Sequence, residues 1–208
     1  FAEFGFRAST RDLARRMGVT QALLYRYFPS KEALINRVFE QRMSAWDPAV
    51  TEALLAATPS LEERLIAFYQ RFAARSSYHG VRLFLRAELD EQRYADRYTL
   101  PLNERILQPV VLALRRESGL SGFDKAPFRR GERELAMTLH GAIAHLGFRK
   151  NLYNSPLPDD LGDHVAFYVR QFLAGAPIML KRIHAGETDQ DMQTVLSAGP
   201  HNSDRPRE

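Results

Sequence analysis

The sequence predicts an all-α protein in which an N-terminal helix-turn-helix three-helix module is followed by a larger helical domain. Three observations predict this fold class. A helix-turn-helix pattern stands near the start, every later periodic segment has helical spacing, and 45% of the 208 residues are hydrophobic, enough for a sizeable core. We expect the module at residues 1–46, the helical domain at 47–183 and a polar, loosely ordered tail at 184–208.

Residues 9–31 have the pattern of two short helices joined by a tight turn. Ser9 and Thr10 stand at an N-cap position. The apolar stripe that follows consists of Leu13, Ala14 and Met17. Gly18 comes next, where a helix end favours a left-handed residue, and Thr20 can cap a second helix that runs to about Phe28. A helix, a glycine-containing turn and a second helix make a helix-turn-helix.

The second helix has the features of a recognition helix. Leu24 and Phe28 lie on one face and hold it to the first helix, which leaves the other face for a DNA major groove. Gln21 can pair with adenine and Arg26 can reach a guanine or a phosphate. The residues we expect to bind DNA are Ser9, Thr10, Thr20, Gln21, Ala22, Leu23, Tyr25, Arg26, Tyr27 and Lys31. An ordinary corner between two helices explains the caps, the glycine and the stripe equally well.

The residue identities favour DNA binding over the ordinary corner. They form a spaced pattern that runs through Phe1, Gly5, Ser9, Thr10, Leu13, Ala14, Gly18, Val19, Thr20, Ala22, Leu24, Tyr25, Tyr27, Phe28, Ser30, Lys31 and Leu34. This pattern resembles the TetR family of one-component transcriptional regulators. The resemblance implies a homodimer on a palindromic double-stranded operator, most simply a repressor that a small-molecule effector releases. Leu23 stands where the family often has a small or hydroxyl residue, so no operator preference carries over.

The start of the chain departs from the family pattern. Phe1, Phe4 and Phe6 lie close together, as though a helix were entered midway. The resemblance implies that most of a first helix and a basic arm are missing from this N-terminus.

The net charge of +4 lies entirely on the module. Residues 1–45 hold eight basic and four acidic residues, whereas the rest of the chain holds 21 of each. Phosphate neutralisation needs such an excess at a DNA-binding surface.

Helices are expected throughout the remaining chain. The first runs from Lys31 to about Trp46 and ends at Asp47-Pro48, and Ser60 opens the next with a capping-box pattern. Ser76-Ser77 interrupts the pattern, and Pro109 is expected to kink the helix that contains it. The later segments expected to be helical are 81–98, 101–119, 128–150 and 160–180.

Two functional surfaces are expected in the helical domain. The resemblance places an apolar or aromatic effector among the middle helices, near Phe72, Phe84, Tyr94, Tyr98 and His140. A close-packed aromatic core with a hydrogen-bonded histidine is the alternative explanation. The last two long helices are expected to form a four-helix dimer interface. Its residues would be Gly141, Ala142, Gly147, Leu161, Val165, Tyr168, Phe172 and Leu173.

Several classes of function find no support in the sequence. No HExxH spacing, glycine-rich phosphate loop or G-x-S-x-G elbow occurs, so we expect no catalytic site, metal or cofactor. The chain has no cysteine and no apolar run of membrane-spanning length, which suits a cytoplasmic protein. The alternative to an effector-responsive regulator is a constitutive DNA-binding protein without an effector. An enzyme or small-molecule carrier would need a reactive constellation that the sequence lacks.

Overall fold

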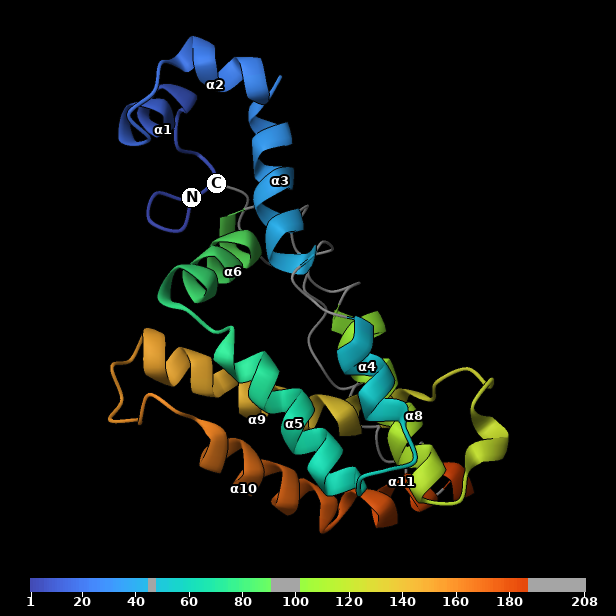
Figure 1. The fold of residues 1–208 in the computed structure, drawn as a ribbon. Helices are drawn as coiled ribbons and strands as arrows, with labels where there is room; N and C mark the ends of the chain where they lie inside the picture. Colours follow the sequence, from blue (N-terminus) through green and yellow to red (C-terminus); the bar gives the residue numbers. More distant parts are fainter. Residues whose placement is uncertain (45–47, 91–101, 187–208) are drawn as a thin grey trace, which may run out of the picture.

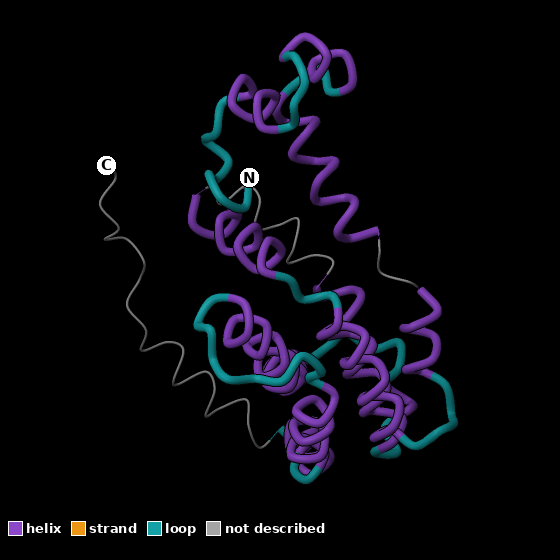
Figure 2. Tube along the Cα trace, turned by 60° about the vertical axis from the view of Figure 1, so that its left-hand side comes forward, coloured by secondary structure: helices purple, strands orange, loops and turns teal. Residues whose placement is uncertain are grey.

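All regular structure in the described part of the chain is helical (Figures 1 and 2). The computed structural model describes residues 1–44, 48–90 and 102–186. The helices are α1 (Thr10–Arg16), α2 (Gln21–Tyr27), α3 (Lys31–Ser44), α4 (Pro48–Leu55), α5 (Leu61–Ala74), α6 (Tyr78–Asp90), α8 (Gln108–Glu117), α9 (Arg130–Asn151), α10 (Gly162–Leu173) and α11 (Ala176–Ala185). A π-helical turn, Asn103–Leu107, precedes α8, and a 3₁₀ turn, Ser121–Phe123, follows it.

The N-terminal module consists of α1, α2 and α3 and stands at the top of Figure 1. Its core is small: Ala14, Leu24 and Leu34 are buried against one another. Leu13, Val19 and Phe28 pack around them, as the apolar pattern predicted. Met17 was expected on the same stripe, but 56% of its surface is exposed. The reason is that α1 ends at Arg16, so Met17 is a cap residue outside the last turn.

The remaining helices form one body around α9. Helices α5, α6, α8, α10 and α11 all contact α9. The centre of its core combines side chains that are fully or almost fully buried: Leu65, Phe68 and Tyr69 of α5, Val110 and Leu114 of α8, Leu139, Ile143 and Leu146 of α9, Val165 and Val169 of α10, and Leu180 of α11. These side chains lie on the helix faces whose apolar spacing predicts burial, and together they form the core of the body.

Three helix predictions need correction. Residues 48–55 form α4, which the sequence analysis did not predict. The single helix expected at 160–180 is two helices, α10 and α11, because the chain turns at Ala174 and Gly175 ahead of Pro177. Pro109 follows a π-helical turn that the sequence did not predict: the Gln108 N–H donates to the Asn103 carbonyl, and Pro109 occupies the first turn of α8, where a proline needs no amide donor.

Other element predictions agree with the structure. Ser60 and Glu63 form the capping box that was expected: Ser60 Oγ accepts from the Glu63 amide, and the Glu63 carboxylate accepts from the Ser60 amide at 3.1 Å. The helix that follows ends at Ala74, directly before Ser76-Ser77. Trp46, the end of the segment expected at 81–98, and residues 187–208 of the expected tail lie outside the described residues.

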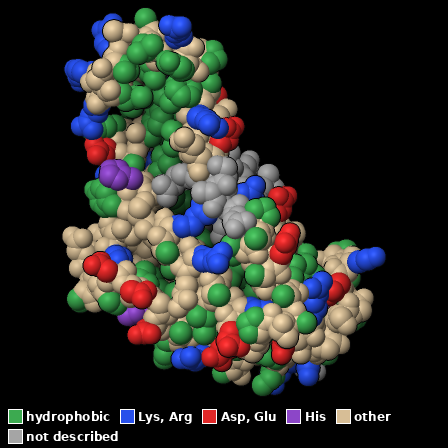
Figure 3. Space-filling model, viewed as in Figure 1, with side chains coloured by type: hydrophobic (Ala, Val, Ile, Leu, Met, Phe, Trp, Pro, Cys, Tyr) green, Lys and Arg blue, Asp and Glu red, His purple; other side chains and the backbone are tan. Residues whose placement is uncertain are grey.

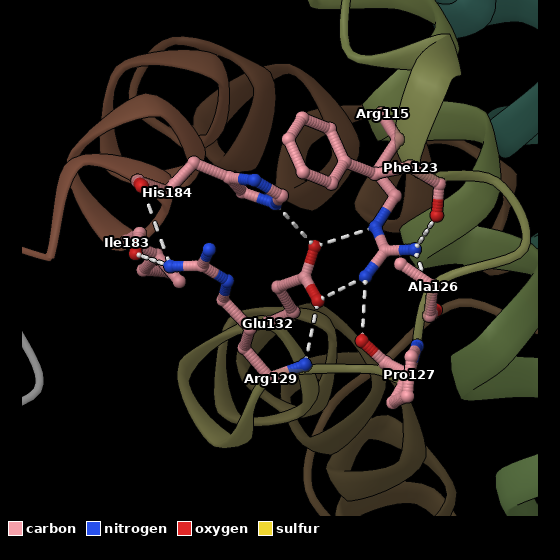
Figure 4. A network of polar contacts seen from close by, with 8 residues as sticks. All are labelled: Arg115, Phe123, Ala126, Pro127, Arg129, Glu132, Ile183 and His184. Carbon is pink, nitrogen blue, oxygen red and sulfur yellow. Dashed lines mark hydrogen bonds and ion pairs between the residues drawn. The ribbon is translucent and has the colours of Figure 1, made fainter.

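A buried polar network fastens α11 to α8 and α9 (Figure 4). Arg115 of α8 and Glu132 of α9 are both fully buried and pair through two hydrogen bonds of 2.7 and 2.6 Å. Arg115 also donates to the carbonyls of Phe123, Ala126 and Pro127, which fixes the loop between these helices. The Nε2–H of His184 donates to the same carboxylate at 2.9 Å.

The network keeps Glu132 ionised inside the protein. Burial alone would raise the pKa of this carboxyl, but hydrogen bonds from Arg115, His184 and the Arg129 amide outweigh it. The net effect is a pKa below the usual range for glutamate. The negative charge of Glu132 is tolerated in this core because hydrogen-bond donors surround both oxygens of its carboxylate.

Candidate nucleic-acid interface

Local hydrogen bonds build the helix-turn-helix. Ser9 caps α1 by accepting from the Asp12 amide, and Thr20 caps α2 by accepting from the Leu23 amide, both at 3.1 Å. Gly18 lies at φ 68°, a left-handed conformation that glycine adopts without steric cost, and the Val19 amide closes the turn on the Ala14 carbonyl. The caps and the glycine thus have the roles that the sequence predicted.

One face of α2 is turned to solvent. Leu24 alone is buried in this helix, and Phe28 is partly buried behind it. The exposed side chains are Ala22, Leu23, Tyr25, Arg26 and Tyr27, of which Tyr27 is 71% exposed. Figure 3 shows basic side chains along the edge of this module around a hydrophobic patch. An exposed recognition-helix face rimmed by positive charge is what major-groove binding requires.

Polar contacts join α2 to the start of α1. The Gln21 Nε2 donates to Thr10 Oγ1 at 2.9 Å, and the Tyr25 hydroxyl lies 3.1 Å from the same oxygen. Ser9 and Thr20 use their hydroxyl oxygens as helix caps. Lys31 is half-buried at the first position of α3. The DNA-binding residues expected from the sequence are therefore brought together at one end of the molecule.

Some basic residues of the module are already paired with acidic neighbours. Arg15 contacts Asp12 at 2.8 Å, and Arg16 contacts Glu3 at 2.6 Å while its guanidinium lies 4.1 Å from the centre of the Phe4 ring. Arg16 holds the pKa of Glu3 below its usual value through this hydrogen bond. Arg16 thus holds the N-terminal segment on α1, and Arg15 pairs within α1, so both are weaker candidates for phosphate contacts than Arg26 or Lys31.

A comparison with protein families decides the assignment. The model of the family described as "Bacterial regulatory proteins, tetR family" matches residues 1–38. Residues 1–38 are a TetR-family DNA-binding module. The chain that carries this TetR module is a DNA-binding transcriptional regulator. No curated protein and no solved structure matches the sequence.

The TetR module is joined to the body by a contact that the sequence analysis missed. Leu83 of α6 is buried in one cluster with Phe6, Ile35 and Phe39, and the Phe6 and Phe39 rings stack at 5.8 Å. Nearby, Arg82 Nε donates to the Ala2 carbonyl at 3.3 Å. The sequence places Leu83 only within the segment expected to be helical at 81–98, and no local pattern specifies which distant helix such a segment meets.

The expected effector residues are only partly brought together. Phe72 of α5 and His140 of α9 are neighbours, with ring centres 4.9 Å apart, and the Tyr69 ring lies 6.2 Å from His140. Phe84 instead packs against Phe148, nearer the end of α9. Tyr94 and Tyr98 lie outside the described residues. Of the five expected effector residues, only Phe72 and His140 therefore lie together in the described part of the chain.

His140 differs from an ordinary hydrogen-bonded core histidine. It is only 3% exposed, and its Nδ1 has no hydrogen-bond partner. Burial lowers the pKa of His140 to about 4, so the ring is neutral at physiological pH. Native proteins seldom leave a buried polar atom unsatisfied, because doing so costs about 1–3 kcal/mol.

The expected dimer residues divide into two groups. Leu161 and Val165 are buried in the core of the single chain, and a Cβ on Gly147 would meet the side chain of Ser76. These three residues face the interior of the body, so their assignment to an intermolecular surface is wrong. Gly141 is exposed with open space beside it, and Ala142, Tyr168, Phe172 and Leu173 are half-buried.

The part of the chain that the structure describes shows neither a metal site nor a membrane span. Among the residues that the structure describes, no group of three or more histidine, aspartate or glutamate side chains is placed to hold a metal ion. None of the described helices combines the length and the apolar character needed to cross a bilayer.

Proposed function

We propose that this chain is a ligand-responsive regulator: a homodimer that binds a palindromic operator, represses from it and is released by a small apolar or aromatic effector in the cytoplasm. We propose no catalytic activity and no cofactor. The observation that carries the proposal is the packing of Leu83 of α6 against Phe6, Ile35 and Phe39 of the N-terminal region. Because a body helix completes this cluster, the position of the module depends on the position of α6.

The effect of a bound effector would reach the module through contacts of α9. Gly147 of α9 packs closely on Ser76 and Val81, and Phe148 meets Phe84 at 6.1 Å, so α6 rests on this end of α9. His140 lies two turns earlier on the same helix. A molecule that binds beside Phe72 and His140 would favour one placement of α6 over another. It acts only through its different affinity for the DNA-binding and the released states.

The chemistry around His140 supports the proposed class of effector. Its neighbours Phe72 and Tyr69 are aromatic, which favours an apolar or aromatic body. The neutral imidazole offers an unpaired nitrogen, which favours a ligand with one polar group, such as a hydroxyl, at one end.

A second copy of the chain is the partner proposed for the outer face of the last helices. The large hydrophobic side chains exposed there are Met137 of α9, Phe167 of α10, and Ile178 and Met179 of α11. Together with the open surface at Gly141 they suit a helix-to-helix contact between identical chains. A dimer also places two recognition helices on two half-sites.

The test begins with an operator selected from random double-stranded DNA. Its affinity is then measured with and without a library of aromatic and aliphatic alcohols, phenols and acids. We expect a palindromic site, a sedimenting species twice the 23.8 kDa chain and compounds that weaken operator binding. The variant His140→Phe should keep operator affinity and lose the response to hydroxyl-bearing compounds.

Each part of the proposal can fail separately. Operator binding that no compound alters would support the constitutive alternative. A single 23.8 kDa species at micromolar concentration would remove the dimer. A selection that returns no preferred site would remove operator recognition altogether.

A further inference from the structure

The hydroxyl of Thr10 occupies a central position between the two helices of the helix-turn-helix. Thr10 is the first residue of α1, and Gln21 is the first residue of α2. The Thr10 oxygen accepts the Gln21 Nε2–H at 2.9 Å and lies 3.1 Å from the Tyr25 hydroxyl. Gln21 and Tyr25 are four residues apart on one helix, so they share the face on which Thr10 sits.

This hydroxyl is not needed to cap α1. Ser9 is the N-cap, and its own oxygen accepts from the Asp12 amide at 3.1 Å. Both contacts of the Thr10 hydroxyl cross to α2 instead. The Thr10 side chain therefore caps nothing in its own helix. It contacts two residues of the next helix that are expected to face the groove, so it affects how those two residues are presented.

The chemistry of a carboxamide makes this contact selective. Gln21 has one acceptor oxygen and two N–H donors. Pairing with the major-groove edge of adenine uses the oxygen, which accepts from N6–H, and one N–H, which donates to N7. The second N–H is surplus to this pairing, and Thr10 accepts an N–H from this nitrogen. When the Thr10 hydroxyl donates its proton to the Tyr25 hydroxyl, its oxygen can only accept from the amide, so the Gln21 nitrogen rather than its oxygen stays beside Thr10.

We propose that Thr10 is a positioning residue for operator readout: its hydroxyl holds the Gln21 carboxamide with the adenine-pairing edge toward the groove. This inference rests on the proposed DNA contact of Gln21. It gives Thr10 a role in base preference, whereas the sequence alone places it near the N-cap of α1 and among the expected DNA-binding residues without a specific role. Ordering a glutamine before binding removes part of the entropic cost that discrimination would otherwise carry.

The test compares four single variants and one double variant on the selected operator and on its single-base substitutions at fixed salt. Thr10→Val keeps the shape and removes the hydroxyl, and Thr10→Ser keeps the hydroxyl. Gln21→Ala removes the base contact, and Lys31→Ala serves as the phosphate-contact reference. We expect Thr10→Val to reduce discrimination about three- to tenfold at the base pair that Gln21→Ala affects. Thr10→Ser should restore the preference, and adding Thr10→Val to Gln21→Ala should change nothing further at that pair.

A purely structural or phosphate-binding role gives different results. If Thr10→Val weakens all sequences alike and lowers the salt slope by about one, as Lys31→Ala should, Thr10 contacts phosphate and the proposal is wrong. If Gln21→Ala shifts the preference and Thr10→Val does not, the base contact stands and the positioning role falls. If Gln21→Ala itself shifts nothing, both fall.

Folding is checked by circular dichroism and by the melting temperature of each variant. If Thr10→Val lowers either, Thr10→Ala replaces it, because alanine is a good helix former at this position. The expected and contrary outcomes for Thr10→Ala are the same as those for Thr10→Val.

Discussion

The TetR module and the helical body are stabilised in different ways. In the module, α1 and α2 have seven residues each, and the cluster between them and α3 has three buried side chains. Helices this short are not stable alone, so caps and neighbouring elements must hold them. The body has a continuous core from α4 to α11 and a buried ion-pair network. The module therefore depends on its caps and on neighbouring elements, and the body depends on its core.

The largest effect should come from the buried network. Glu132→Gln removes the charge that faces Arg115, which is itself fully buried. An uncompensated buried guanidinium typically costs about 3–5 kcal/mol in the free energy of unfolding. Urea denaturation followed by circular dichroism measures this loss, and we expect it to affect the body more than the module.

The matched control is an exposed pair in the same body. Arg170 of α10 contacts Glu62 of α5 at 2.8 Å, with both side chains substantially exposed. Solvent screens such a pair, so Glu62→Gln should cost less than about 1 kcal/mol. Equal losses for the two variants would contradict the importance of burial at Glu132.

The second prediction concerns the contact between the two regions. Leu83→Ala leaves a cavity among Phe6, Ile35 and Phe39, and a buried leucine replaced by alanine costs about 2–5 kcal/mol. Because the cavity lies at the junction, amide exchange should accelerate in α3 and the N-terminal segment more than in α9. Operator affinity should fall as well. Uniform acceleration across both regions would show that the module and body unfold as one unit.

The sequence predicted the module well because its signals are local. Ser9, Gly18 and Thr20 act on atoms within a few residues of themselves, so their spacing alone specifies caps and turn. The prediction that Met17 is buried was wrong because the apolar spacing continues one residue past the end of α1. The stacking of Phe6 on Phe39, and the packing of Leu83 of α6 in the same cluster, join segments far apart in sequence, and no local pattern encodes these contacts.

For the body, the sequence predicted the helices but not how they pack against one another. Apolar spacing indicates which face of a helix is buried but not which partner covers it. Val165 illustrates this: its stripe suited a dimer interface and the core of one chain equally, and the structure buries it in the core. Arg115 and Glu132 are charged residues that a hydrophobic period treats as exposed, so their pairing had no signal in the sequence.

The third prediction concerns the pH dependence of the stability of the body, to which His140 contributes. Burial lowers the pKa of His140 from 6.5 to about 4, so between these values the unfolded chain binds a proton that the folded chain does not. Stability therefore decreases as the pH falls through this window, by about 2 kcal/mol at pH 5 from this residue. His140→Phe should remove that part of the pH dependence in urea titrations at pH 7.5 and pH 5.

His145 provides the control for this titration. It lies on the exposed side of the same helix, so His145→Asn removes a histidine from α9 without removing a buried group, and its stability is compared at the same two pH values. If His140→Phe and the unmodified protein lose stability equally between the two pH values, the buried neutral state assigned to His140 is wrong.

The smallest effect compares one helix cap in each region. Thr20 caps α2 through the Leu23 amide, and Ser60 caps α5 through the Glu63 amide. Replacing either by alanine removes one hydrogen bond and should cost about 1 kcal/mol.

In the body, the large core around Leu65 and Phe68 holds α5 in place, so Ser60→Ala should leave operator affinity unchanged. In the module, the seven-residue α2 has one fully buried anchor, Leu24, and Thr20→Ala should fray the groove-facing end and weaken operator binding several-fold. Affinity measured at fixed salt, beside the free energy of unfolding, separates the two cases. Equal losses of affinity for both variants would contradict the view that the module depends on its local caps while the body depends on its core.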